Sequence, residues 1–305
     1  MTTPASADRQ DRRVMGSAPS QGRIRNAMSI DVEDYFQVSA FAPYIQRGDW
    51  DHRECRVERN VGRILDLLDG RGVKATFFTL GWIAQRYPQL VRDIVARGHE
   101  LASHGYGHER ASDLSPTAFR EDILSAKHLL EDLGGVAVKG YRAPSFSIGE
   151  SNLWAFDVLA DCGYRYSSSV YPIEHDHYGM PDSPRFAYEV RPGLIEVPVT
   201  TLRFRGRNYP SSGGGWFRLL PYGVTRWMIE RFNRIEGRSA VFYFHPWEID
   251  PAQPRIDGID AKTRFRHYVN IGRTESRIEQ LLADFEWARM DELFLPSAVD
   301  QREAA

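Results

Sequence analysis

Cysteine is nearly absent from this chain: Cys55 and Cys162 are the only two among 305 residues. Two cysteines so far apart in the sequence cannot build a disulfide framework or a thiolate metal cluster. Any bound metal ion must therefore use nitrogen and oxygen ligands.

An excess of one charge and a long apolar run are also missing. The 39 Lys and Arg residues nearly balance the 41 Asp and Glu residues, for a formal net charge of -2. Without a clustered cationic excess, nucleic acid is not an expected partner. No stretch approaches the roughly 18 apolar residues of a membrane-spanning helix, and no apolar stretch follows the first charged residues as in a signal peptide. We therefore expect a protein of the cytoplasm, or one held peripherally at the inner membrane.

The composition that is present predicts a folded globular chain. Hydrophobic residues make up 42% and aromatic residues 12% of the sequence, enough to build a large core. Residues 1–26 are rich in Ser, Ala, Arg, Gln and Pro without periodicity, and we expect them to be a disordered leader. Residues 296–305 are expected to be a tail.

Short apolar runs alternate with helical patterns from residue 27 onward, which predicts parallel strands joined by crossover helices. The expected strands are 28–32, 74–80, 99–103, 139–142, 164–168, 195–199 and 241–245. The expected helices are 56–69, 88–97, 116–132, 151–161, 221–236 and 275–289. A single series of about seven strands favours an α/β fold with a closed or nearly closed barrel.

Two clusters of polar residues follow expected strands. Asp31, Glu33 and Asp34 crowd the end of the first strand, where like charges raise one another's proton affinity. His104 and His108 follow the third strand, with glycines between them that favour a loop over a helix. Two histidines and one carboxylate form a common catalytic zinc shell. Each cluster taken alone also fits a solvated surface loop.

Further polar residues stand at two other strand ends. Arg142 ends the fourth strand and His245 ends the seventh. Singly, the arginine fits a structural salt bridge and the histidine a core position. Because the carboxyl ends of parallel barrel strands meet at one mouth, however, these residues are expected to lie beside the two clusters.

With these motifs in view, the chain resembles the polysaccharide deacetylases, the NodB-homology group or carbohydrate esterase family 4. It is most similar to the subgroup encoded beside exosortase and exopolysaccharide loci. The resemblance rests on SIDVEDYFQVSAF, ATFFTLGWIA, GHELASHGYGH, GYRAPSF, VFYFHPWEIDPAQPR and RFRHYVNIGRTE. It implies a distorted (β/α)7 barrel forming one domain over residues 27–295, with a family-specific C-terminal segment from about residue 246.

The resemblance also implies roles for individual residues. His104 and His108 match the two histidine ligands of a divalent metal ion, with Zn2+ the expected ion, although cobalt, nickel and iron suit such a site too. Asp31 matches the catalytic base, Arg142 the arginine that orients it, and His245 the general acid.

The acidic metal ligand has more than one alignment. Asp-Val-Glu-Asp can place either Glu33 or Asp34 on the metal, or Glu33 as the base. We choose Asp34 as the ligand and Asp31 as the base.

The sequence departs from the family pattern at two places. Ser145 stands where a tyrosine is usual, at a position whose backbone N–H is expected to bind the oxyanion. The fifth strand has serines at 167–169 and no aspartate of the kind that tunes the catalytic acid. The protonation of His245 is therefore left open.

The resemblance predicts a metal-dependent deacetylase that removes N-acetyl groups from an amino-sugar exopolysaccharide or its lipid-linked precursor. Such an enzyme would bind an N-acetylated oligo- or polysaccharide and work at the periphery of an exopolysaccharide assembly complex. Trp216 and Trp247 are the preferred candidates for stacking on sugar rings. Two alternatives remain: a hydrolase of small ureide-type C–N bonds, and a catalytically silent carbohydrate-binding barrel.

Overall fold

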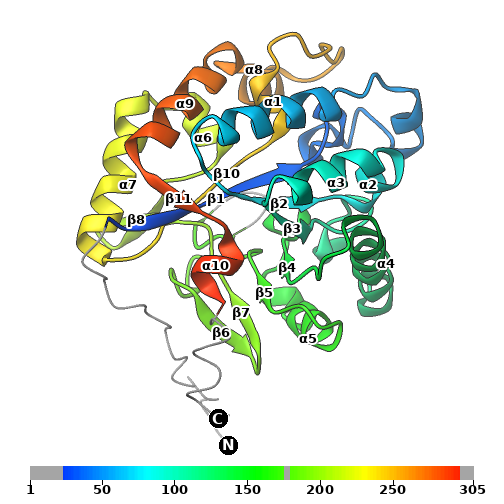
Figure 1. Ribbon diagram of the computed structural model, residues 1–305, viewed down its shortest axis with the longest axis horizontal. Helices are drawn as coiled ribbons and strands as arrows, with labels where there is room; N and C mark the ends of the chain where they lie inside the picture. Colours follow the sequence, from blue (N-terminus) through cyan, green and yellow to red (C-terminus); the bar gives the residue numbers. More distant parts are fainter. Residues whose placement is uncertain (1–22, 175–178, 296–305) are drawn as a thin grey trace, which may run out of the picture.

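The computed structural model describes residues 23–174 and 179–295, which fold around one curled and mostly parallel sheet (Figure 1). The strands are β1 (Arg25–Val32), β2 (Thr76–Thr79), β3 (Glu100–Ser103), β4 (Gly140–Tyr141), β5 (Tyr166–Ser167), β6 (Tyr188–Arg191), β7 (Leu194–Glu196), β8 (Thr201–Phe204), β9 (Arg207–Pro210), β10 (Val241–Phe244) and β11 (Glu286–Ala288). The main sheet has the order β10-β1-β2-β3-β4-β5-β7-β6, and β11 pairs with the first residues of β1.

Helices cover the outer face of this sheet (Figure 1). The α-helices are α1 (Val57–Asp69), α2 (Gly81–Arg86), α3 (Pro88–Ala96), α4 (Pro116–Gly134), α5 (Trp154–Asp161), α6 (Gly214–Leu219), α7 (Tyr222–Glu236), α8 (Ala261–Tyr268), α9 (Thr274–Asp284) and α10 (Met290–Phe294). The 3-10 helices are η1 (Tyr35–Gln37), η2 (Ser39–Phe41), η3 (Arg47–His52), η4 (Ala111–Asp113), η5 (Pro144–Phe146), η6 (Glu150–Asn152), η7 (Pro246–Ile249) and η8 (Ile271–Arg273).

Local sequence signals account for the long helices. In α4, the Ser115 hydroxyl accepts a hydrogen bond from Ala118 N, Pro116 occupies the first turn, and Gly135 ends the helix at a φ of 65°. In α1, Val57, Val61, Ile64 and Leu68 recur at helical spacing and are buried. That apolar stripe packs in the same core as Ile30 of β1.

The expected α/β architecture is confirmed, and all seven expected strands are present. The sheet is curled rather than closed, because no ladder joins β10 to β6 or β7 in the described residues. The helix expected over 275–289 ends at Asp284, and β11 follows it. The first strand begins at Arg25, inside the expected leader; residues 1–22 and the tail at 296–305 lie outside the described part of the chain.

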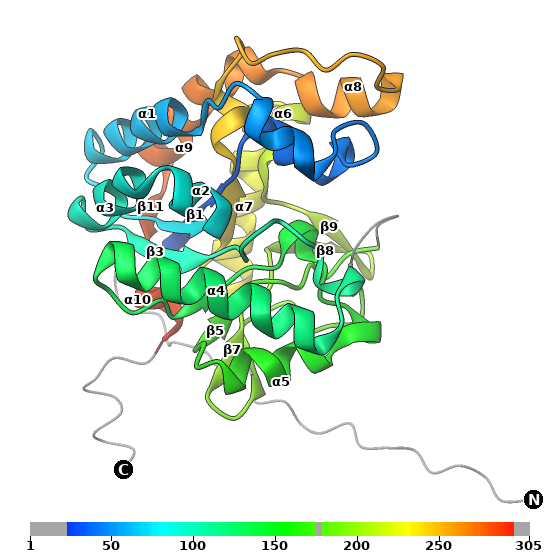
Figure 2. The same ribbon diagram turned by 90° about the vertical axis from the view of Figure 1, so that its right-hand side faces the viewer.

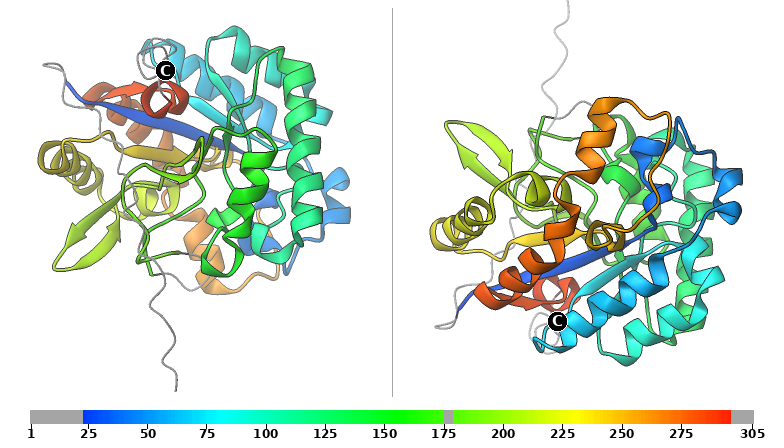
Figure 3. Two further views of the ribbon diagram at one scale, coloured as in Figure 1. Left: turned by 90° about the horizontal axis from the view of Figure 1, so that it is seen from below. Right: turned by 90° about the horizontal axis from the view of Figure 1, so that it is seen from above.

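Sequence reasoning missed the short elements β6, β8 and β9. Strand β6 is the antiparallel partner of β7, and β8 and β9 form a separate hairpin. Figure 3 shows this yellow-green hairpin projecting from the body. Its exposed Arg203, Arg205 and Arg207 gave no apolar run to detect. Among the described helices, none is long and apolar enough to cross a bilayer.

Candidate functional site

The polar residues predicted from four strand ends do come together. Asp31 is the last but one residue of β1, His104 directly follows β3, Arg142 follows β4, and His245 follows β10. All four strands run parallel in one sheet, so their carboxyl ends lie on the same side of the sheet. The segment after β1 extends to the start of α8 (Figure 2), where the Tyr44 hydroxyl donates a hydrogen bond to the Asp260 carboxylate.

Glu33, His104 and His108 form a candidate metal site. One ligand atom from each residue lies within 4.8 Å of the other two, and the side chains are nearly or fully buried. Glu33 Oε2 is 2.6 Å from His108 Nε2. Burial would raise the pKa of Glu33, but the charges of His108 and His245 hold it below its usual range, so the carboxyl is ionised. Two imidazoles and one carboxylate fit a zinc-type ion with a coordination position left for water or substrate.

The backbone orients His104 for this role. Its Nδ1 is 2.8 Å from the carbonyl oxygen of Arg142, which fixes Nδ1 as the donor and leaves Nε2 as the ligand atom. Burial lowers the pKa of His104 to about 4, so the imidazole is neutral near neutral pH. A neutral imidazole is the form that binds metals.

The structure corrects the choice of Asp34 as the acidic ligand. Asp34 Oδ2 accepts hydrogen bonds from Arg56 N at 2.6 Å and Val57 N at 2.9 Å, at the start of α1, and Oδ1 accepts one from Tyr35 N. These free N–H groups of a helix end need acceptors, and Asp34 supplies them. Glu33 takes the position beside the histidines. The period-two alternation of extended chain, which puts Asp31 and Glu33 on one face, was the signal that could have identified it.

Asp31 is held by a fully buried arginine. Arg142 Nη1 lies 2.5 Å from Asp31 Oδ1 and also donates to the Ser29 hydroxyl, while Nη2 donates to the Ser168 hydroxyl. The guanidinium is thus held between β1 and the residue that follows β5, and it fixes the direction in which Asp31 presents its second oxygen. The role of Arg142 in orienting a catalytic base stays a prediction.

His245 faces the two carboxylates. Its Nε2 is 3.9 Å from Asp31 Oδ2 and 3.5 Å from Glu33 Oε1, and its side chain is 20% exposed, more than the other groups of the site. Burial disfavours the imidazolium, but Glu33, Glu248 and Asp31 outweigh that effect and raise the pKa of His245 to about 9. The ring is therefore protonated near neutral pH, as a general acid must be.

The loop after β4 carries an unusual backbone. Ser145 and Phe146 have φ values of 55° and 49°, in the left-handed region. In the loop after β3, His108 has a φ of 56° in the same region. Non-glycine residues in this region are strained by roughly 1–3 kcal/mol each, and such residues cluster at functional sites. The Ser145 hydroxyl is 2.5 Å from the Ser39 hydroxyl, so the side chain is tied to η2. The oxyanion role of the Ser145 N–H stays a prediction.

The two tryptophans predicted to bind sugar differ in placement. Trp216, in α6, is 38% exposed and remains a candidate. Trp247 is 4% exposed, because its indole is stacked between the rings of His245 and His267. A ring covered on both faces cannot stack on a pyranose, so Trp247 is corrected to a buried packing residue.

Glu248 and Arg218 belong to the site and were missed. Glu248 Oε1 is 2.6 Å from His245 Nδ1, and Glu248 Oε2 is 2.7 Å from Arg218 Nε. All three side chains come from the chain beyond residue 168. The spacing of His245 and Glu248, three residues apart, was a usable signal. The partner Arg218 was not predictable from spacing.

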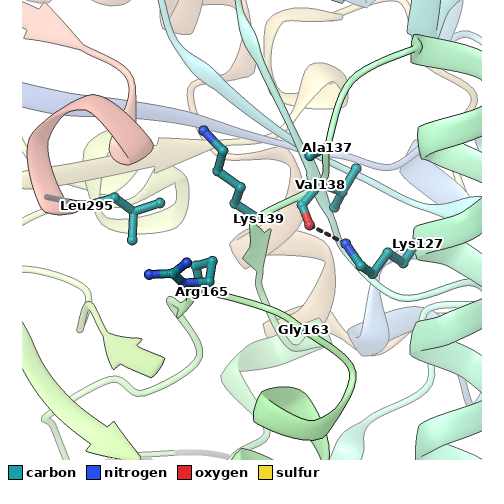
Figure 4. Close-up of a pocket in the computed structure, with 7 residues that line it drawn as sticks. All are labelled: Lys127, Ala137, Val138, Lys139, Gly163, Arg165 and Leu295. Atoms are coloured by element: carbon teal, nitrogen blue, oxygen red, sulfur yellow. Dashed lines mark hydrogen bonds between the residues drawn. The ribbon is translucent and has the colours of Figure 1, made fainter. Parts of the chain in front are cut away.

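A pocket at the amino ends of β4 and β5 is lined by basic side chains (Figure 4). Lys139 and Arg165, which directly precede β4 and β5, line it together with Lys127. The Lys127 ammonium is already bound to the Val138 carbonyl and to Glu131. Among the described residues that line this pocket there is no histidine or carboxylate side chain.

Comparison with known proteins gives two family matches on this chain. Residues 50–167 match the model described as polysaccharide deacetylase, and residues 168–295 match a domain of unknown function, DUF3473. His104, His108 and Arg142 lie in the first match, and His245 and Glu248 lie in the second. Asp31 and Glu33 lie before both matches, so the site draws on both matched segments and on the end of β1.

Individual relatives agree with the first match. A peptidoglycan-N-acetylglucosamine deacetylase of Bacillus cereus is 37% identical over 94 residues, which are 30% of this chain and 34% of that protein. A chitooligosaccharide deacetylase of a Bradyrhizobium species is 28% identical over 137 residues, 43% of this chain and 60% of that protein. The chain thus aligns with less than two thirds of either relative.

A solved structure supports the fold over nearly the whole chain. A provisionally named polysaccharide deacetylase from Mycobacterium smegmatis has a TM-score of 0.63 and 21% identity, covering 96% of this chain and 95% of its own. At this identity the similarity establishes the α/β fold.

Proposed function

We propose that this protein is a metal-dependent hydrolase that removes N-acetyl groups from an amino-sugar glycan, because residues 50–167 match the polysaccharide deacetylase model. The observation that carries the proposal is the cluster of Glu33, His104 and His108 beside Asp31 and His245. Amide hydrolysis needs an activated water, a stabilised oxyanion and a proton for the departing amine. This cluster provides groups for each of the three.

Each of the three steps is assigned to a residue whose surroundings suit it. Asp31, held by Arg142, accepts the proton of the attacking water. His245 Nε2 donates a proton to the leaving amine, consistent with its raised pKa of about 9. The N–H of Ser145 is assigned to the developing oxyanion, where loss of one such donor typically costs roughly 2.7–4 kcal/mol.

Glu33, His104 and His108 would hold the metal ion. When bound, a zinc-type ion supplies Lewis acidity for the acetamide carbonyl and for the attacking water. The buried position of the three ligands favours a water-excluded site in which this charge acts strongly.

For the substrate, we propose an N-acetylated oligo- or polysaccharide, and within that class an exopolysaccharide or its lipid-linked precursor. The first two relatives are named for peptidoglycan N-acetylglucosamine and for chitooligosaccharides, both amino-sugar glycans. Exposed Trp216 offers an aromatic surface for a sugar ring, and it lies two residues beyond Gly214, which packs on Glu248. The choice of an exopolysaccharide or its lipid-linked precursor follows the resemblance of the motifs to the exopolysaccharide-locus subgroup.

The test is an acetate-release assay on N-acetylglucosamine oligomers, run with metal analysis of the same preparations. We expect wild-type protein to hold one metal ion and to release acetate, and His108→Ala to lose both. A wild-type protein with stoichiometric metal and no acetate release from any oligomer would overturn the proposal.

A further inference from the structure

The orientation of His245 depends on Glu248. His245 directly precedes the 3-10 helix η7 and Glu248 lies within it, and Glu248 Oε1 accepts hydrogen bonds from both His245 Nδ1 at 2.6 Å and His245 N at 3.1 Å. With Nδ1 occupied, only Nε2 can face Asp31 and Glu33. Glu248 is fully buried, so water cannot replace it as the acceptor.

Glu248 is in turn fixed by residues distant in sequence. Arg218 is 3% exposed, and its Nε lies 2.7 Å from Glu248 Oε2. Its Nη1 donates to the carbonyl oxygens of His267 and Val269 at 2.5 and 3.1 Å. The arginine therefore ties the carboxylate to the C-terminal end of α8.

The glycine-rich loop before α6 makes room for this pair. A Cβ atom at Gly214 would lie 1.8 Å from Glu248 Oε1, closer than any real contact. Gly213, at a φ of 111°, packs in the same way against Tyr243 on β10. Gly213 and Gly214 thus let α6 start directly against the carboxylate.

A stack of rings fixes the plane of His245. The Trp247 indole lies 5.3 Å from the His245 ring at an angle of 18°, and 4.2 Å from the His267 ring at 14°. Its Nε1 donates to Glu33 Oε1 at 3.2 Å. One indole therefore touches both the candidate general acid and the candidate metal ligand.

We infer that Glu248, supported by Arg218, is the positioning residue of His245 and takes the place of the acidic residue missing from the fifth strand. The inference rests on the proposed function for the role of His245. It gives a definite role to the segment 168–295, whose family model is a domain of unknown function. That segment supplies the proton donor and holds it in its working direction.

The test compares Glu248→Gln with the double variant Arg218→Met/Glu248→Gln. Gln keeps the shape but removes the charge, and the double variant also removes the buried guanidinium that would otherwise be left unpaired. We expect kcat for acetate release to fall about 10- to 100-fold in both, within or below the range a general acid contributes. KM and zinc content should stay unchanged, and the double variant should regain thermal stability without regaining kcat.

Asp250→Asn is the matched control. Asp250 is another buried carboxylate near η7, but its partners are Arg56, Arg59 and Asn60. We expect it to lose stability and keep kcat. Recovery of kcat together with stability in the double variant, or kcat within twofold of wild type in Glu248→Gln, would overturn the inference.

A proton NMR spectrum separates this inference from the proposed function. The Nδ1–H of His245, bound to a carboxylate, should give a strongly downfield resonance that is absent in His245→Gln and shifts upfield in Glu248→Gln. If wild-type protein releases no acetate but shows this resonance and its shift, the proposed function fails and the positioning contact stands. An unshifted resonance in Glu248→Gln refutes the contact whatever the activity.

Discussion

The Nδ1 atom of His104 is hydrogen-bonded at 2.8 Å to the main-chain carbonyl of Arg142, 38 residues further along the chain. The residue that holds the candidate base thus also fixes, through its backbone, one of the candidate metal ligands. Strands β3 and β4 are adjacent, and the register pairs Ser103 with Tyr141, so this contact follows directly from the sheet. The metal site and the proton-transfer site are built as one unit.

The choice between the two acidic residues after β1 is directly testable. We expect Glu33→Gln to lower zinc affinity at least about 100-fold, more than the 10- to 100-fold typical of a residue behind the ligands. Asp34→Asn should bind zinc like wild type, because its carboxylate caps α1 instead. Isothermal titration with zinc measures both, and a zinc-binding defect confined to Asp34→Asn would restore the original assignment.

Much of this arrangement could be predicted because parallel strands bring their carboxyl ends together. Asp31, His104, Arg142 and His245 each lie at the end of an expected strand, so their convergence required only the α/β alternation. The contacts of Glu248 with Arg218 could not be predicted in the same way. They depend on how α6 packs on η7, which no local pattern encodes.

Burial explains the correction of Trp247, and side-chain direction explains that of Asp34. Trp247 and Trp216 have the same side chain, yet one is enclosed by His245 and His267 and the other is partly exposed. Asp34 and Glu33 are both buried, and only the direction of the side chain separates a helix cap from a metal ligand. Such directions come from tertiary packing.

Arg142 gives a second prediction. Arg142→Lys keeps a positive charge near Asp31 but cannot also reach Ser29 and Ser168 with a planar fork of donors. We expect kcat to fall at least about 10-fold while zinc content stays at one ion per chain. Arg56→Lys, which alters a pair with Asp250 away from the site, serves as the control. Equal losses of kcat in the two variants would show that stability, rather than the orientation of Asp31, limits activity.

Trp216 gives a third prediction. Removing an exposed ring that stacks on a sugar should raise KM for long oligomers about 5-fold, as expected for the loss of roughly 1 kcal/mol of aromatic contact. Trp216→Ala should leave the unfolding temperature nearly unchanged, and KM for a monosaccharide substrate should not move. Trp227→Ala, on α7 and 51% exposed, is the matched control. If both variants raise KM equally, the rise in KM does not come from the loss of a sugar-binding site at Trp216.

Because of Glu196, we expect the free energy of unfolding to fall as the pH rises from about 4.5 to 7. Its carboxyl is fully buried, and burial raises its pKa from the ordinary value of 4.5 to about 7. Below about pH 4.5 the group is protonated in both folded and unfolded chains. As pH rises toward 7 the unfolded chain ionises first, so the free energy of unfolding falls, and the loss is complete above pH 7.

Glu196→Gln removes that loss, because its amide oxygen can still accept from Ser169 N and Val170 N. The variant should match wild type near pH 4.5 and exceed it by about 3 kcal/mol near pH 8, the free energy corresponding to such a raised pKa. Urea denaturation at both pH values measures the difference, and Glu58→Gln on the exposed face of α1 should show none. A variant less stable than wild type at pH 8 would mean that Glu196 is ionised and needed as a charge beside Arg142.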